Sequence, residues 1–194
     1  MFVLSAVADD CLQYKKMPRI LLNTPDWTKQ VVQPSESLDL WHGNVVATLV
    51  DKYEILTDVK QVDNGYCVIL NTVDAIVGYS DFLVQIDISH VPDSCEYNAI
   101  LKHENSHVKT YLSVIDDYKK DLQKAIFSAS DSIMPVFVKS KDDIDLVVED
   151  INNKIQSHPD LMLIKQKIKA DEEIKNKQID RHESNKDLEK CSKK

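Results

Sequence analysis

The sequence predicts an α+β fold, in which an N-terminal antiparallel β-rich half precedes a helical half. Short β-branched runs fill residues 17–90, and Asn64-Gly65 is a strong hairpin signal between two of them. Apolar residues then recur at helical spacing from Glu96 to Ser128, and again from 161 to 190. We therefore expect a long helix, carrying a His-Glu-x-x-His motif, to pack against a C-terminal helix.

The β-rich half is expected to contain several short strands. Candidate runs are 20–22, 30–32, 43–50, 53–62, 66–70, 75–79 and 82–88. In the last run Val84, Ile86 and Ile88 alternate with polar residues, which is typical of a half-exposed strand. We expect this strand at a sheet edge, where an extended peptide can add to it by main-chain hydrogen bonds.

Turn and capping residues separate the expected helices. Val91-Pro92 breaks the chain, and Asp93 or Ser94 can cap the long helix. A shorter helix is expected at 141–156. The last helix, from 161, has an apolar stripe that passes through Ile168.

Length and composition favour a single globular domain, expected at residues 9–190, with a tail at 191–194. The net charge of −8 argues against nucleic-acid binding, and no apolar run is long enough for a membrane span. Residues 1–8 resemble the end of a secretory signal with a small-x-small site at Ala6-Val7-Ala8, although an ordinary N-terminus is the alternative. The sequence does not indicate an oligomeric state.

Four cysteines suit an exported protein with disulfides, at a periplasmic or secreted location, although a cytoplasmic protein with four free thiols is the alternative. If all four are oxidised, three pairings are possible. The residues are Cys11, Cys67, Cys95 and Cys191.

The motif His103-Glu104-Asn105-Ser106-His107 makes the most definite chemical suggestion. Residues four apart in a helix share a face, so His103 and His107 can bind one metal ion. Glu104 lies about 100° further round, where its carboxylate can act as a general base toward water. This arrangement predicts a zinc site with Glu104 as the catalytic residue.

A catalytic zinc site takes a third protein ligand, which must come from outside the motif. We expect Glu183, with Asp187 one turn further on as a partner of a ligating histidine. His182 is the alternative ligand, and Glu172 is a weaker one. Candidates for stabilising an oxyanion are Tyr111, Tyr118, His158, Arg181 and His182.

Cysteine positions provide an independent check on Glu183. Cys95 precedes His103 by eight residues, and Cys191 follows Glu183 by eight. If the two helices pack antiparallel with Glu183 near the histidines, Cys95 and Cys191 reach the same end and can pair. Cys11 would then pair with Cys67.

Residues 100–108 resemble the active-site helix of the zincin metallopeptidases, and Glu183-x-x-x-Asp187 is similar to the third-ligand segment of the gluzincin branch. The stretch from Phe82 to Leu188 also resembles a bacterial domain family of predicted secreted zinc-dependent proteases. The resemblance implies a zinc-dependent peptidase. The polar residues within the motif and the long spacing to Glu183 depart from the gluzincin pattern.

Two functional hypotheses follow. The first is a zinc metallopeptidase that hydrolyses peptide bonds in a peptide or protein, with Glu104 as general base. The second is a non-catalytic metal-binding or helical protein-interaction module of the envelope. Substitution of Glu104 by Gln separates them, since only the enzyme needs that carboxylate.

Overall fold

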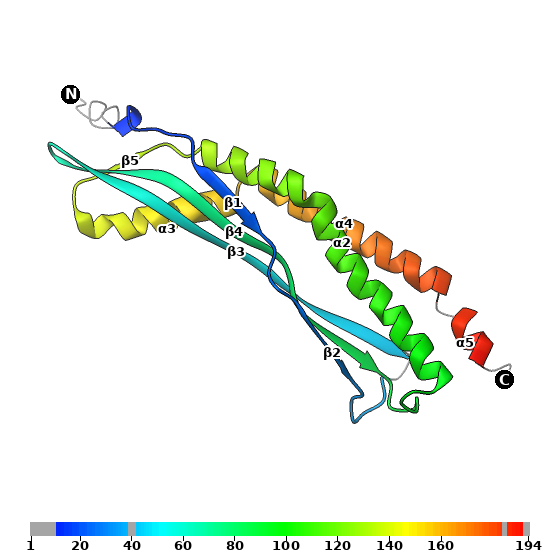
Figure 1. Cartoon of the computed structure of the whole chain (residues 1–194). Helices are drawn as coiled ribbons and strands as arrows, with labels where there is room; N and C mark the ends of the chain where they lie inside the picture. Colours follow the sequence, from blue (N-terminus) through cyan, green and yellow to red (C-terminus); the bar gives the residue numbers. More distant parts are fainter. Residues whose placement is uncertain (1–10, 39–41, 184–185, 192–194) are drawn as a thin grey trace. The chain divides into compact units, whose positions relative to one another are not determined.

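The computed structural model describes residues 11–38, 42–183 and 186–191, with the backbone alone at 182, 183, 186, 187 and 189. The strands are β1 (Arg19–Asn23), β2 (Thr28–Val32), β3 (Gly43–Val62), β4 (Gly65–Ile86) and β5 (Val136–Val138). The helices are α2 (Cys95–Asp131), the short 3₁₀ helix η1 (Lys141–Asp143), α3 (Ile144–Gln156), α4 (Pro159–Glu183) and α5 (Lys186–Cys191) (Figure 1). The predicted signal remnant at 1–8 lies outside the described residues.

One long strand organises the sheet. β1 runs parallel to β4 at residues 72–76, and β2 runs parallel to it at residues 81–85. β3 pairs with β4 across the turn at 63–64, and β5 is antiparallel to β4 at Tyr66–Val68. Every described strand therefore pairs with β4.

The predicted fold class is wrong. The two N-terminal strands are parallel to β4, whereas an antiparallel β-rich half was expected. Strands and helices are also not segregated along the chain, because β5 follows α2 and joins the same sheet. Parallel neighbours need a long connection instead of a tight turn, so no local sequence pattern indicates their pairing.

Gly78 lies where β4 exchanges one parallel neighbour for the other. Its φ of 153° falls in a region that residues with a Cβ rarely adopt. A Cβ there would lie 2.9 Å from Pro25 Cδ, in the link between β1 and β2. Glycine therefore allows one unbroken β4 where the sequence predicted separate strands at 75–79 and 82–88.

The edge position expected for residues 82–88 is also wrong. β2 pairs with residues 81–85 of β4, and β3 pairs with β4 as well. The predicted alternation holds at Val84 and Ile86, which are buried, but it ends before Ile88, which is exposed next to the buried Asp87. Alternation reports which face of a strand is covered, and it carries no information about which edge is paired.

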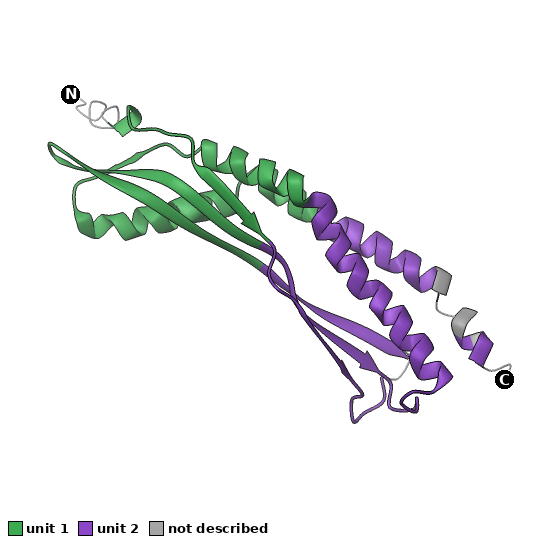
Figure 2. Ribbon diagram, in the orientation of Figure 1, with its two compact units in different colours: residues 1–23, 51–76, 119–166 green, residues 24–50, 77–118, 167–194 purple. Residues whose placement is uncertain are grey.

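The chain divides into two compact units (Figure 2). The first comprises residues 1–23, 51–76 and 119–166, and the second comprises 24–50, 77–118 and 167–194. In the first unit, the disulfide Cys11–Cys67 lies in an apolar cluster with Ile69, Val62 and Phe137. None of the described helices has the length and apolar character that crossing a membrane requires.

The second unit contains β2, the start of β3, the end of β4, residues 95–118 of α2, and the C-terminal part of α4. Its buried apolar residues come from β4, α2 and α4, and include Tyr79, Phe82, Val84, Ile100, Val108, Val114 and Ile168. The disulfide Cys95–Cys191 joins the first residue of α2 to the last residue of α5. Both expected cysteine pairings are confirmed, and two disulfides are consistent with an exported protein.

Candidate metal centre

Helix α2 carries the His-Glu-x-x-His motif in its third and fourth turns. The helix begins after Ser94, whose Oγ accepts a hydrogen bond from the Tyr97 backbone N–H at 3.1 Å. This is the arrangement of a helix N-cap, and it fixes where the helical turns start. Because His103 and His107 are four residues apart in this helix, they lie one turn apart on one face.

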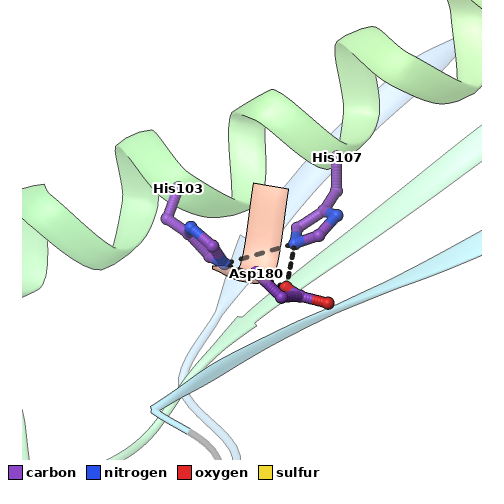
Figure 3. Close-up of side chains that lie close together, drawn as sticks. All are labelled: His103, His107 and Asp180. Carbon is purple, nitrogen blue, oxygen red and sulfur yellow. Dashed lines mark hydrogen bonds and ion pairs between the residues drawn. The ribbon is translucent and has the colours of Figure 1, made fainter. Parts of the chain in front are cut away.

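The two histidine rings converge on Asp180 of α4 (Figure 3). His103 Nε2 and His107 Nε2 are 3.2 Å apart. Asp180 Oδ1 lies 3.1 Å from His107 Nε2 and 3.4 Å from His103 Nε2. Three ligand atoms from two helices therefore form a nearly equilateral triangle.

The triangle fits a metal ion in chemistry and in size. Two imidazole nitrogens and one carboxylate oxygen are a common ligand set for catalytic zinc. Ligands placed tetrahedrally about 2.05 Å from zinc lie about 3.3 Å from one another, which matches the three edges of 3.1, 3.2 and 3.4 Å. The three atoms are therefore spaced as three ligands of one metal ion would be.

Asn176 of α4 orients one of the two rings. His107 Nδ1 lies 2.8 Å from Asn176 Oδ1, and an amide oxygen only accepts hydrogen bonds. In this contact Nδ1 is therefore the donor, and Nε2 faces the triangle. A hydrogen bond of this kind fixes the ring and its tautomer in metal sites.

The carboxylate of Glu104 is packed between α2 and the start of β3. Glu104 is 5% exposed, and a Cβ on Gly43 would lie 2.6 Å from its Oε1 and 2.7 Å from Ile100 Cγ2. Only glycine at position 43 leaves room for the carboxylate in this position. Glu104 thus occupies a defined pocket beside the strand.

Burial raises the pKa of the Glu104 carboxyl to about 7, with the nearby Asp180 carboxylate raising it and His107 lowering it. A carboxyl that ionises near neutral pH both accepts and donates protons readily. A metal cation in the triangle would lower this pKa again, because positive charge favours the carboxylate.

A groove of about 450 Å³ adjoins the triangle along α4. Its size suits a small ligand or a side chain of a larger one. Asp180 and Asn176 line the groove, and Tyr79 and Tyr111 face each other there with ring centroids 5.0 Å apart. The other lining residues are Ala47, Lys169, Glu172, Glu173 and Lys177.

The third ligand offered by the described side chains is Asp180, which the sequence did not suggest. The side chains of Glu183, His182 and Asp187 lie outside the described residues, so their roles stay predictions. Glu172, the weaker candidate, accepts a hydrogen bond from Tyr79 OH at 2.7 Å in the groove.

Asp180 has a signal in the sequence. Glu172, Asn176 and Asp180 recur every four residues of α4, and four residues advance a helix by about 40° beyond a full turn. Asp180 is therefore about 120° from the apolar stripe at Ile168, on its flank. The third ligand was predicted on the stripe itself, whereas Asp180 lies beside it.

The candidates for oxyanion stabilisation have separate locations. Tyr111 lines the groove with Asp180, and burial is the main cause of its raised pKa. Arg181 is exposed, and Tyr118 lies further along α2 beside Asp171. His158 belongs to the first unit, where its ring pairs with Asp160.

Polar residues inside the motif have structural roles. Asn105 Oδ1 accepts a hydrogen bond from Lys29 Nζ of β2 at 2.7 Å, and Ser106 Oγ donates to the Lys102 carbonyl at 3.3 Å. Asn105 thus contacts the strand next to β4.

Comparison of the chain with protein families, with curated proteins and with solved structures gives no match.

Proposed function

We propose that this chain is a zinc-dependent hydrolase that cleaves peptide bonds, with its metal held by His103, His107 and Asp180. The observation that carries the proposal is the triangle of ligand atoms, with edges of 3.1–3.4 Å, next to the buried carboxylate of Glu104. The order His-Glu-x-x-His places metal ligands and a general base within two helical turns.

Zinc is favoured over other metals. Two histidines and one carboxylate also form the ligand set of non-haem iron sites, and nitrogen donors disfavour Mg²⁺ and Ca²⁺. The edges match tetrahedral zinc, and the glutamate directly after the first histidine is the arrangement of zinc hydrolases. Metal analysis of the purified protein distinguishes zinc from iron directly.

Each residue has a distinct task in the proposed reaction. His103, His107 and Asp180 bind the metal, and Asn176 fixes the His107 ring through the Nδ1 hydrogen bond. When bound, zinc supplies a Lewis acid that polarises a carbonyl group and lowers the pKa of water. Glu104 takes up the proton of the attacking water and delivers it to the leaving amine.

A peptide substrate is supported by the groove and by the strand beside it. Among the described strands, β3 pairs only with β4, so one edge of β3 lacks a strand partner. Ala47 of β3 lines the groove that also contains Asp180. An extended peptide adding to this edge by main-chain hydrogen bonds would pass the metal ligands.

A non-catalytic metal clamp is the second candidate, and the burial of Glu104 favours it. A carboxylate that is 5% exposed has little contact with water, which a general base needs. In this alternative the metal joins α2 to α4, as the disulfide Cys95–Cys191 joins α2 to α5. Export to the periplasm or outside the cell suits both candidates, because disulfides persist there.

Glu104→Gln separates the two candidates, with Glu96→Gln as a matched control on the same helix. The enzyme hypothesis predicts one tightly bound zinc ion per chain after purification in both variants, and cleavage of a random peptide library by wild type and Glu96→Gln alone. Chelation should abolish the cleavage, and zinc should restore it. If zinc-loaded wild type cleaves no peptide, the peptidase proposal is wrong; if the folded protein takes up no zinc, the metal proposal is wrong as well.

A further inference from the structure

A second pair of histidines, His42 and His90, lies outside the triangle described above. His42 Nδ1 and His90 Nε2 are 3.1 Å apart, with ring centroids at 5.2 Å and planes inclined by 61°. Both residues belong to the second unit (Figure 2). Their nitrogen separation is nearly the 3.2 Å found between His103 and His107.

Hydrogen bonds hold the backbone at both histidines. Asp87 N–H donates to the His42 carbonyl at 2.9 Å, and His90 N–H donates to the Asp87 carbonyl at 3.1 Å. Gln33 Nε2 donates to the His90 carbonyl at 2.7 Å and to the Asp87 carbonyl at 3.2 Å. The two rings are therefore brought together by a fixed segment of backbone.

The Asp87 carboxylate serves as an anchor for this segment. Its Oδ1 accepts from the backbone N–H and the hydroxyl of Ser89, and its Oδ2 accepts from Leu38 N–H at 2.6 Å and Ser37 Oγ at 2.8 Å. These donors, the Ser89 hydroxyl first, lower the pKa of the Asp87 carboxyl. The Asp87 carboxylate is thus used within this segment. The two ring nitrogens hydrogen-bond to each other, and release of the shared proton would leave both to bind an ion.

We propose that His42 and His90 form a second metal site, which binds a borderline divalent cation such as Zn²⁺, Ni²⁺ or Cu²⁺ through His42 Nδ1 and His90 Nε2. Imidazole nitrogens bound to one such ion lie about 2.9–3.3 Å apart, for square-planar or tetrahedral geometry. His42 is exposed, so an ion reaches the pair from solvent and water fills its remaining positions. With two protein ligands, this site binds zinc more weakly than the triangle does.

The site is tested by counting bound zinc with Zn²⁺ as the probe. Equilibrium dialysis at pH 7.5, read by elemental analysis, should give two zinc ions per wild-type chain at saturation. His42→Ala and His90→Ala should each give one. His158→Ala is the matched control, because it removes a histidine that pairs with Asp160, and it should still give two.

A complementary measurement removes the stronger site. His103→Ala combined with His107→Ala should leave one zinc ion, and adding His42→Ala should remove it. If the double variant does not fold, the triangle is filled with one zinc ion and the second is followed by the NMR signals of the His42 and His90 rings. The proposal is overturned if His42→Ala binds as many zinc ions as wild type, or if excess zinc leaves those ring signals unchanged.

The outcome is independent of the proposed hydrolase. A chain that binds one zinc ion lost with His103→Ala, and no second ion, would refute only this site. A chain whose zinc is lost with His42→Ala, but not with His103→Ala, would instead refute the triangle.

Discussion

Removal of the Tyr79 hydroxyl tests how much its hydrogen bond stabilises the buried carboxylate of Glu172 in the groove. Tyr79 OH donates to Glu172 Oε1 at 2.7 Å, and the two residues are 7% and 8% exposed. Tyr79→Phe deletes one oxygen atom and leaves the ring contacts with Tyr111 and Phe82 in place. Glu172 then keeps its burial and loses its donor.

The expected cost is about 1.5–3 kcal/mol of unfolding free energy at pH 8, the usual range for a hydrogen bond to a charged group. Burial raises the pKa of the Glu172 carboxyl, and the Tyr79 hydrogen bond lowers it. Without the hydroxyl this pKa rises further, so the folded protein binds a proton more readily than the unfolded chain does. Stability of the variant therefore increases as pH falls through the raised pKa, and its deficit relative to wild type shrinks toward pH 5.

Guanidinium unfolding at pH 8 and pH 5, followed by circular dichroism with a chelator present, measures both effects. A double-mutant cycle with Glu172→Gln isolates the pair, and Tyr66→Phe in the first unit is a matched control. A loss below about 0.5 kcal/mol at pH 8 would fall short of the expected hydrogen-bond range and refute the reasoning. So would a loss of equal size at both pH values.

Three further predictions concern the metal centre and its surroundings. Asp180→Asn should weaken zinc binding at least about 100-fold in chelator competition, which is more than the loss of a hydrogen bond to a metal ligand causes. Glu183→Gln should bind zinc as tightly as wild type does. The reverse result would make Glu183 the ligand. Gly43→Ala should lower the unfolding free energy by about 1–3 kcal/mol, because its Cβ would lie 2.6 Å from a buried carboxylate oxygen; an unchanged denaturation midpoint would contradict this packing. Replacing Cys95 and Cys191 by Ser should lower the unfolding free energy by about 4–5 kcal/mol, because the disulfide closes a loop with a sequence separation of 96 residues. A loss below about 1 kcal/mol would show that the bond scarcely restrains the unfolded chain.

Features that depend on short stretches were predictable from the sequence. Ser94 was one of two expected caps, and it accepts the hydrogen bond that starts α2. The turn before Gly65 was expected, and β3 and β4 meet across it. The pairing of Cys95 with Cys191 was expected from the equal spacings of eight residues to His103 and Glu183, and it is present although the last helix is divided into α4 and α5.

Features that depend on distant segments were not predictable. β1 and β2 are five residues long, and each finds its partner in β4 about 50 residues later. Nothing within β1 or β2 specifies that partner or its direction, so the antiparallel prediction was wrong. For Asp180, the four-residue series with Glu172 and Asn176 marks a polar face of α4, but which member of the series meets the histidines depends on the rotation of α4 against α2.

The bond between Cys95 and Cys191 makes a covalent ring of the chain from one cysteine to the other. His103, His107 and Asp180 all belong to this ring. A single proteolytic cut between His107 and Asp180 would therefore open the ring without releasing a fragment, and the three residues would stay on one covalently linked molecule. On a gel, such a nicked molecule would migrate as one species until a reducing agent separated its two pieces.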